Sequence, residues 1–463
     1  MARLSPRLSS ARLEPVATLA VLVVAGVALA LVLQRGGVFY ATAAGLAALT
    51  LAMALRFPYQ VMVALLVAGV FAASYLELVP PLSGPVLLSV LALVCGLGVS
   101  FRTRFDFVGR PLVLVALGLA GLWMLGAVLV GRTTEGVALT GLATMAGVVQ
   151  VAQTARGRRA VLFGLAVGSV VAALYGVFTV IAGQNPVLEL GVRQGAQTDF
   201  IVSTARFGFA RAVGAFSHPI MLGTFLGLGG LAALELARLK AIKDRTAVLF
   251  VVVAFSGQLA TISRGPIVAT LGSIAIWIVF GRRMSLRWRV CATAGVAALV
   301  VGALWLGGLK GDVGSLFGTS AGDALAGSTQ YRIELAKALV QRLPHAPLLG
   351  FPNPDTATFL PGFRSLDNEI AYLGLTRGLL GLAVFGALLV VPIFASAVRR
   401  GPLVLSRLYV VLSMSYLMVV GGTVAYFGLL VFFLFVVLAL CWVAISAPSP
   451  LASVPPEEDP AAD

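Results

Sequence analysis

The sequence predicts an all-α, polytopic membrane protein with about 12–14 transmembrane helices and two long extracytoplasmic loops. Of its 463 residues, 59% are apolar and only 11% are charged, which is too little charge for the surface of a soluble protein of this length. Apolar stretches of about 20 residues, the length that crosses a bilayer, recur from Pro15 almost to the C-terminus. Arginine and lysine gather in alternate connections between these stretches.

The apolar stretches define a single helical membrane domain over residues 1–447. The first stretch, Ala11 to Gln34, leads directly into further spans, so we interpret it as an anchor rather than a cleavable signal peptide. Residues 448–463 are rich in proline and acidic residues, which predicts a disordered acidic cytoplasmic tail. The expected spans are residues 15–34, 38–55, 58–78, 84–101, 111–131, 135–154, 160–182, 214–237, 246–262, 266–281, 289–308, 370–397, 403–421 and 423–446.

The strongly basic charge has a topological explanation. The formal net charge is +15, but most basic residues lie in short connections on one side of the expected bundle, including residues 102–110, 156–159, 238–245, 282–289 and 399–407. Lysine and arginine accumulate in cytoplasmic loops, so this pattern places both termini in the cytoplasm. It also makes the lipid bilayer, and not nucleic acid, the expected partner of the charge.

Two long loops break the basic pattern. They cover about residues 184–213 and 309–369, and the alternation places both outside the membrane. Each mixes acidic and basic side chains, unlike the short connections on the opposite side. In a chain so poor in charge, we expect polar chemistry in these loops.

Arginines occur where the outer loops meet the spans. Arg206 and Arg211 precede the span that begins near Gly214, and Arg264 sits between two short spans. A guanidinium makes paired, charge-assisted hydrogen bonds to phosphate, so each is a candidate ligand for a phosphate or pyrophosphate head group. The alternatives are that Arg206 or Arg211 reaches towards lipid head groups, and that Arg264 lies in a surface turn.

Further candidates flank the later part of the outer region. Asp367 and Asn368 directly precede the span that begins near Ile370, where a carboxylate acts either as a general base or as a helix N-cap. His218 precedes Pro219 and either contacts substrate or caps a span. Arg332 is one of several charges on an expected amphipathic helix, where charges are usually inert.

Signs of metal or nucleotide chemistry are missing. The sequence has no Walker sequence, no Asp-x-Asp pair and no His-Glu-x-x-His. Its two histidines are far apart, and Cys95, Cys291 and Cys441 each fall in an expected span without a short spacing. We therefore expect no metal site and no cofactor.

Four segments, taken in order, resemble the bacterial O-antigen ligase and polymerase superfamily, multispan enzymes that handle polyprenyl-pyrophosphate-linked sugars. They are Arg211 to Gly223 (RAVGAFSHPIMLG), Thr261 to Gly265 (TISRG), Tyr331 to Gly350 with Arg332, Pro347 and Gly350, and Leu366 to Gly381 (LDNEIAYLGLTRGLLG). The resemblance covers roughly residues 206–381, and it rests on the order, spacing and outward placement of these segments.

The resemblance implies a role for each candidate. It implies that Arg211, Arg264 and Arg332 hold the pyrophosphate of the donor and that Asp367 activates the acceptor hydroxyl. Ligases typically have His-Asn where this sequence has Asp367-Asn368, and a Glu where it has Arg377. The aspartate resembles the polysaccharide polymerase branch more than the lipid A ligases.

The expected function is that of a metal-independent glycosyltransferase in the bacterial cytoplasmic membrane. It would join polyprenyl-pyrophosphate-linked oligosaccharide repeat units on the outer face, with a glycan or lipid as acceptor. One alternative is a ligase that passes a finished glycan to a lipid, protein or wall acceptor. Another is a transporter or flippase of lipid-linked sugars. Transporters show related halves and charged or interrupted helices near the midplane, whereas this sequence shows no clear internal repeat and its polar residues are concentrated in the outer loops.

Overall fold

The fold is taken from a computed structural model of the chain. The structure describes residues 49–72, 77–79, 82–103, 111–129, 136–193, 205–206, 209–216, 218–280, 285–288, 290–291, 334, 337–351, 369–399, 403–421 and 429–446. The expected spans 15–34 and 289–308 lie wholly or largely outside these residues, as do the expected tail 448–463 and the site residues Arg332, Asp367 and Asn368.

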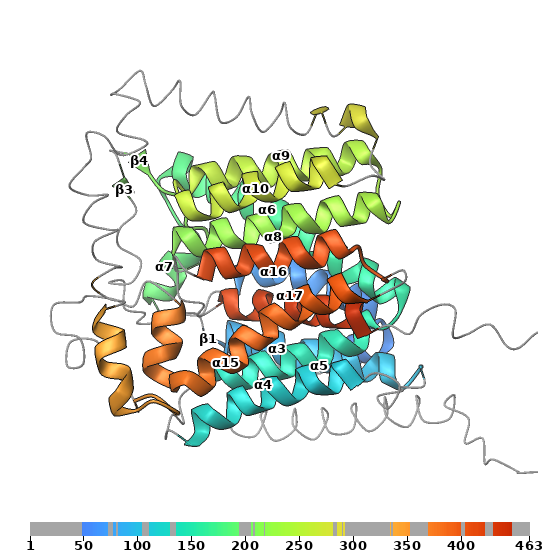
Figure 1. Cartoon of the computed structure of the whole chain (residues 1–463). Coiled ribbons are helices and arrows are strands. Elements are labelled where there is room, and N and C mark those ends of the chain that lie inside the picture. The colour runs from blue at the N-terminus through green and yellow to red at the C-terminus, as the bar shows by residue number, and fades with distance from the viewer. Residues whose placement is uncertain are drawn as a thin grey trace, which may run out of the picture.

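Helices dominate the described residues, and two very short antiparallel hairpins accompany them (Figure 1). The hairpins pair β1 (Glu77–Val79) with β2 (Leu82–Ser83) and β3 (Ala205–Arg206) with β4 (Phe209–Ala210). The helices are α2 (Pro58–Ala68), η1 (Gly69–Phe71), α3 (Gly84–Ser100), α4 (Pro111–Leu129), α5 (Gly136–Ala152), α6 (Ala155–Ala182), α7 (Pro186–Arg193), α8 (Pro219–Arg238), α9 (Asp244–Ala260), α10 (Arg264–Phe280), η3 (Leu343–His345), α15 (Glu369–Val398), α16 (Arg407–Gly421) and α17 (Leu429–Ser446).

Local sequence signals explain several helix ends. Proline occupies the first turn of α2, α3 and α8, where its missing N–H costs no hydrogen bond. The Thr154 hydroxyl caps α6 by accepting a hydrogen bond from the backbone N–H of Gly157 at 2.9 Å. Gly183 ends the same helix in the left-handed conformation that glycine adopts easily.

Four helices are long and apolar enough to cross a membrane: α6, α8, α15 and α17. The described helices α2, α3, α5, α9, α10 and α16 have 11–17 residues and α4 has 19; each coincides with an expected span, although the boundaries differ by several residues in places. The prediction of an all-α protein with apolar, membrane-type helices is therefore confirmed. The number of spans and the sidedness of the loops stay predictions.

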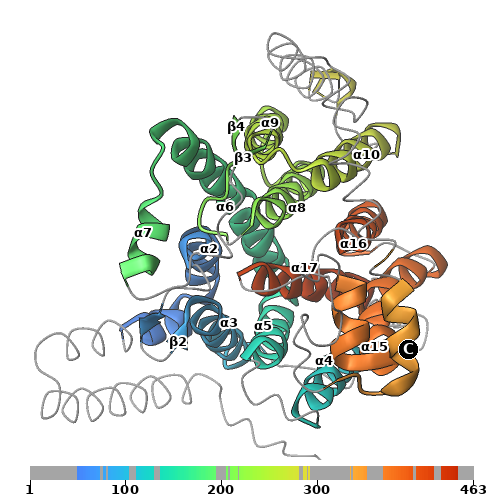
Figure 2. The ribbon, with the colours of Figure 1, turned by 90° about the vertical axis from the view of Figure 1, so that its left-hand side faces the viewer.

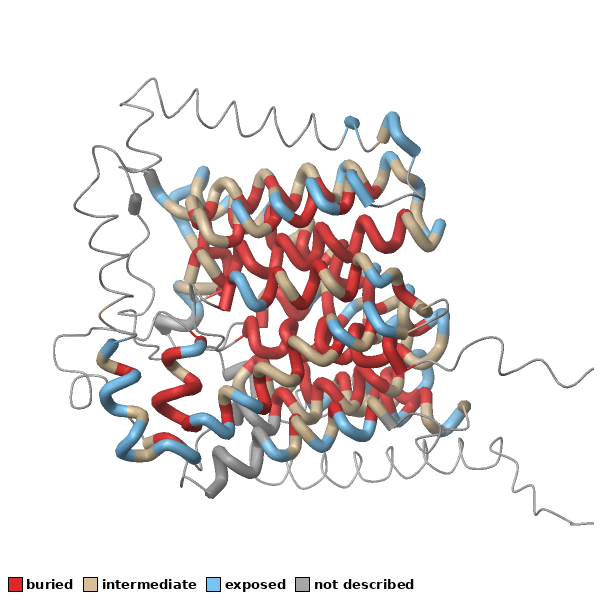
Figure 3. Tube along the Cα trace, viewed as in Figure 1, coloured by how far each residue is buried: buried red, intermediate tan, exposed pale blue. Residues whose placement is uncertain are grey.

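Exposed and half-buried residues lie on the outside of the bundle (Figure 3), and many of the exposed ones are large and apolar. Val268 and Val279 on α10 and Phe394 on α15 each expose about two thirds of their surface. Patches of this kind are costly in water, whereas a bilayer solvates them as readily as a protein core does. The exposure pattern supports the assignment to a membrane.

The core is built around α17. All 18 residues of this helix are buried, and it contacts α3, α4, α5, α8, α15 and α16. Figure 2 shows it at the centre of the bundle. A helix that is apolar on all sides needs apolar neighbours on all sides, and here protein supplies them. The Trp442 indole N–H donates to the carbonyl of Leu388 on α15 at 3.1 Å, which fixes one side of α17.

The two ends of the bundle differ in character (Figure 1). One end carries α7, the β3–β4 hairpin and the α9–α10 turn, and the other carries the basic connection between α8 and α9. At the latter end, Glu235 of α8 is fully buried and holds the start of α16: its carboxylate accepts from the Ser406 N–H at 2.8 Å and from the Ser406 hydroxyl at 2.7 Å. Arg238 pairs with the same carboxylate at 2.7 Å.

Candidate functional site

The segment that begins with Arg211 is a buried strap that ends in a turn at residues 214–216. Residues 212–216 are all buried, and they lie between the α6–α7 connection and the end of α9. On one side, the Asn185 side-chain amide donates to the carbonyl of Gly214 at 2.8 Å, and the Tyr175 hydroxyl holds Asn185 in place at 2.8 Å. On the other side, the N–H of Ala212 donates to the carbonyl of Ala260 at 2.8 Å. The strap is therefore fixed from both sides.

This strap delivers Arg211 to the α9–α10 turn. The Arg211 Nε donates to the carbonyl of Thr261 at 2.9 Å, and its Nη2 donates to the Ser263 hydroxyl at 3.1 Å. Both acceptors belong to the second of the four segments identified in the sequence. The structure thus joins the first and second segments through a guanidinium whose plane is set by two acceptors, on a side chain that is only partly buried.

The α9–α10 turn is tight and strained. It reverses the chain in three residues, Thr261 to Ser263, and Ile262 adopts φ = 50°. A β-branched residue in the left-handed region costs about 1–3 kcal/mol, and such strain gathers at functional sites. Ser263 is buried, and Arg264 follows at once as the first residue of α10, with a partly exposed side chain. Arg211 therefore contacts the residue next to Arg264, which places two arginines from distant segments at one turn.

A buried polar cluster around Gln258 lies in the helix bundle next to the turn. The Gln258 amide nitrogen donates to the carbonyl of Gly223 and to the Thr270 hydroxyl, both at 2.8 Å, and lies 3.3 Å from the Tyr416 hydroxyl. These groups come from α8, α9, α10 and α16, so the cluster ties four helices together. Gln258 was not among the residues predicted from the sequence, although a glutamine in a strongly apolar span is an available signal.

His218 serves as the N-cap of α8. Its Nδ1 accepts a hydrogen bond from the backbone N–H of Ile220 at 3.1 Å, in front of Pro219 in the first turn. The capping alternative raised by the sequence is therefore confirmed. A contact between His218 and substrate stays a prediction.

The other predicted residues are placed only in part. The backbone of Arg206 lies in β3, where it pairs with Phe209 of β4 close to the strap. The Arg206 side chain lies outside what the structure describes, and Arg332, Asp367 and Asn368 lie outside the described residues altogether. Their convergence with Arg211 and Arg264 stays a prediction.

A break in α15 forms a second assembly at the same end of the bundle. Gly378 has non-helical backbone angles, φ = 60° and ψ = −159°, so the helix that matches the expected span 370–397 is interrupted at this residue. The loop around Gly350 fills the break: Phe351 N–H donates to the carbonyl of Leu375 at 2.8 Å, and Leu379 N–H donates to the carbonyl of Pro347 at 2.7 Å. Exchange of hydrogen bonds with the loop satisfies backbone groups that an interrupted helix leaves open.

This assembly joins the third and fourth segments identified in the sequence. A Cβ on Gly378 would lie 2.6 Å from the carbonyl carbon and oxygen of Leu348, and a Cβ on Gly350 would lie 2.6 Å from the carbonyl oxygen of Leu375. Both glycines have positive φ. The two backbones touch because neither position carries a side chain.

Charged residues accompany the break. Glu369 and Arg377 on the first part of α15 are 3% and 4% exposed, and Thr376 beside them is 1% exposed. Buried ionisable groups in membrane helices are costly and usually functional. Arg377 was not predicted as a site residue from the sequence, where it appeared only as a departure from a family pattern. The signal that was available is a charged residue directly before a glycine within an apolar run.

No protein family model and no curated protein matches the chain. Among the described residues, no three His, Cys, Asp or Glu side chains lie together in a way that could hold a metal ion. The chemistry that the described site offers is that of guanidinium groups held at one end of a helical bundle. Such groups bind phosphate oxygens by paired, charge-assisted hydrogen bonds.

Proposed function

We propose that the chain is a membrane glycosyltransferase that joins polyprenyl-pyrophosphate-linked oligosaccharide repeat units on the outer face of a bacterial cytoplasmic membrane. One observation carries the proposal: the Arg211 guanidinium is anchored on the α9–α10 turn, beside Arg264, by bonds of 2.9 and 3.1 Å. Two arginines at one turn suit a diphosphate, which presents several oxygens at close range.

In the proposed reaction, the acceptor hydroxyl attacks the anomeric carbon of the donor sugar. A new C–O bond forms as the bond between that carbon and the pyrophosphate oxygen breaks. Asp367 takes the hydroxyl proton as general base. The polyprenyl pyrophosphate leaves with the bonding electrons, and Arg211, Arg264 and Arg332 stabilise its developing negative charge.

Remaining candidates take supporting roles in this proposal. Arg206 lies in the hairpin that precedes the strap and would contact the donor from the loop side. Asn368 would orient the acceptor beside Asp367, and His218 would fix the start of α8 while facing the donor. The lipid tail of the donor would stay in the bilayer, so its head group would enter sideways between helices.

The test is the chain length of the surface polysaccharide in a deletion strain of the source bacterium. The strain carries wild type, Arg211→Ala, Arg264→Ala or Asp367→Asn, and membrane levels are compared by blot. Arg399→Ala serves as control, because it removes an equal charge at the other end of the bundle. We expect the three site variants to leave mainly single repeat units and the control to make long chains. Long chains from well-expressed Arg264→Ala and Asp367→Asn would refute the assignment of the site.

The same experiment separates a ligase. If unmodified polymer of full length accumulates without its acceptor in the site variants, transfer of the finished glycan is the lost step. If the protein is a polymerase, the purified protein should convert the donor substrate alone into a ladder of longer glycans. A ligase should leave the donor unchanged until an acceptor is added.

The break in α15 is the observation that favours a transporter of lipid-linked sugars. Transporters often bind substrate where a helix is interrupted, and buried Glu369 and Arg377 lie on the interrupted part here. Loss of a flippase should leave lipid-linked repeat units on the cytoplasmic leaflet, whereas loss of a polymerase should leave them on the outer leaflet. Labelling of intact cells with a membrane-impermeant, sugar-reactive probe distinguishes the two.

A further inference from the structure

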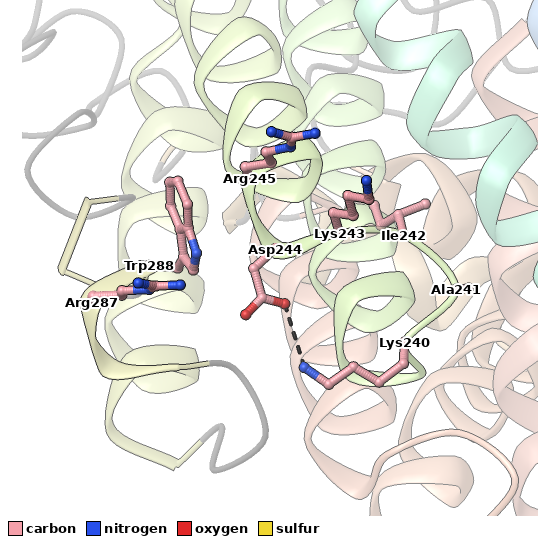
Figure 4. A pocket seen from close by; sticks show the side chains of 8 residues that line it. All are labelled: Lys240, Ala241, Ile242, Lys243, Asp244, Arg245, Arg287 and Trp288. Carbon is pink, nitrogen blue, oxygen red and sulfur yellow. Dashed lines mark ion pairs between the residues drawn. The ribbon is translucent and has the colours of Figure 1, made fainter.

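A basic pocket lies at the opposite end of the bundle from the candidate site. It has a volume of about 670 Å³ and lies between the α8–α9 connection and the segment around Trp288. Figure 4 shows Trp288 and Arg287 on one side of this pocket and Lys240 on the other, with Asp244 between them. Lys243 and Arg245 complete its charged lining. The pocket therefore combines positive charge with an indole ring.

A second pocket adjoins the first. It has a volume of about 490 Å³ and shares Lys240 and Ala241 with its neighbour. Arg156 and Arg159 of α6 line it, and the Arg156 guanidinium lies 5.2 Å from the centre of the Tyr59 ring. A guanidinium over an aromatic face is held in place by cation–π attraction.

Charge in the two pockets is strongly one-sided. Six basic residues line them, namely Arg156, Arg159, Lys240, Lys243, Arg245 and Arg287, against one acidic residue, Asp244. Asp244 pairs with Lys240 at 3.6 Å, but the Lys240 side chain is 65% exposed, and ion pairs this exposed contribute little. The surplus of positive charge attracts anionic ligands.

The backbone of Lys240 is in a strained conformation. Lys240 follows the C-cap of α8 and has φ = 55°, the left-handed conformation for which glycine is preferred. Its N–H donates to the carbonyl of Ala237, and the Ala241 N–H donates to the carbonyl of Leu236, which completes a Schellman motif. A lysine at this position is strained where glycine would be relaxed.

We propose that these adjoining pockets bind the phosphate of an anionic glycerophospholipid. Basic pockets between membrane helices recognise such head groups, and aromatic residues mark the interface at which the head groups lie. Tyr59 and Trp288 line the pockets, while Phe163 and Leu249 expose apolar surface on the adjacent α6 and α9 for acyl chains. A phospholipid is favoured over free phosphate as the ligand because basic side chains and exposed apolar side chains occur together here.

The test uses the full chain in nanodiscs of phosphatidylcholine, with or without phosphatidylglycerol. Retention of phosphatidylglycerol after transfer to neutral detergent is measured by native mass spectrometry, and thermal stability is measured in each lipid. Lys240→Gly is the informative variant, because it removes the charge and relieves the left-handed backbone. Arg245→Ala combined with Arg287→Ala is a second variant, and Arg399→Ala is the charge-matched control outside both pockets.

Wild type should retain phosphatidylglycerol and gain stability from it. Lys240→Gly should retain it about fivefold more weakly, as expected for loss of one charge near a head group, yet be at least as stable as wild type in phosphatidylcholine. The double variant should lose roughly 25-fold. Inorganic phosphate in large excess should not replace the lipid.

Three outcomes would overturn the proposal. Equal retention by wild type and both pocket variants would show that the pockets do not bind lipid. An equal loss in Arg399→Ala would reduce the effect to general surface charge. Full stabilisation by inorganic phosphate would make a soluble anion the ligand.

Discussion

Substitution of Gly378 by alanine tests the backbone contact that organises the break in α15. The new Cβ would lie 2.6 Å from the carbonyl group of Leu348 and 2.7 Å from the nitrogen of Gly350, and all of these are backbone atoms that cannot rotate away. Overpacking of this kind costs about 1–3 kcal/mol. The angles φ = 60° and ψ = −159° fall in a region almost restricted to glycine, which adds about 1–3 kcal/mol. We expect a total loss of roughly 2–6 kcal/mol.

The cysteines of the chain provide the assay. Cys95 and Cys441 are buried, whereas Cys291 is exposed. In a Cys291→Ser background, a thiol-reactive fluorescent dye therefore reports unfolding as the two buried thiols become accessible. The melting temperature of Gly378→Ala in detergent should fall clearly below that of the parent protein.

Gly386→Ala in the same helix is the matched control. A Cβ at Gly386 meets nothing within 4 Å, so alanine should be neutral or stabilise by up to about 1 kcal/mol. If Gly378→Ala melts with the parent and Gly386→Ala, then the loop of residues 347–351 does not fill the break, and the contact between the third and fourth segments is wrong.

Three further substitutions probe other contacts. Ser263→Ala removes one anchor of Arg211 at 3.1 Å and should reduce polymer formation at least about tenfold with unchanged membrane levels, because a hydrogen bond to a charged group is worth about 1.5–3 kcal/mol. Full activity would show that Ser263 does not position Arg211. Glu235→Ala removes the buried carboxylate of a partly buried ion pair together with its two bonds to Ser406, and should cost about 3 kcal/mol in the thiol assay. An unchanged melting temperature would contradict the contact with Ser406. Tyr416→Phe loses one hydroxyl of the buried polar cluster and should cost about 1 kcal/mol; a gain in stability would show that this hydroxyl is not bonded.

The sequence was sufficient for the helices but not for the break in α15. Apolar runs locate helices directly because the bilayer demands them, and each described helix longer than eight residues matches an expected span. Gly378 looks like any other small residue in such a run. Its special conformation depends on backbone atoms of residues 347–351, which lie far upstream, and no local pattern records that contact.

The candidate site, too, was predicted only in part from the sequence. The sequence identified Arg211 and Arg264 by residue type and position, and the structure joins them at one turn through Thr261 and Ser263. The sequence prediction missed Gln258, although a glutamine in an apolar span was an available signal. It also missed the strap anchor Asn185, because a neutral amide in a loop carries little information until its partners are known. Side-chain hydrogen bonds between distant segments were the part that pattern alone did not supply.

The central position of α17 has a consequence for biogenesis. The helix is synthesised after every other described helix, yet it fills the middle of the bundle and is buried along its whole length. The inner faces of the earlier helices therefore lack this partner until α17 has been inserted. A chain truncated before Leu429 should expose those faces to lipid and to quality-control proteases, even though it keeps every residue of the candidate site.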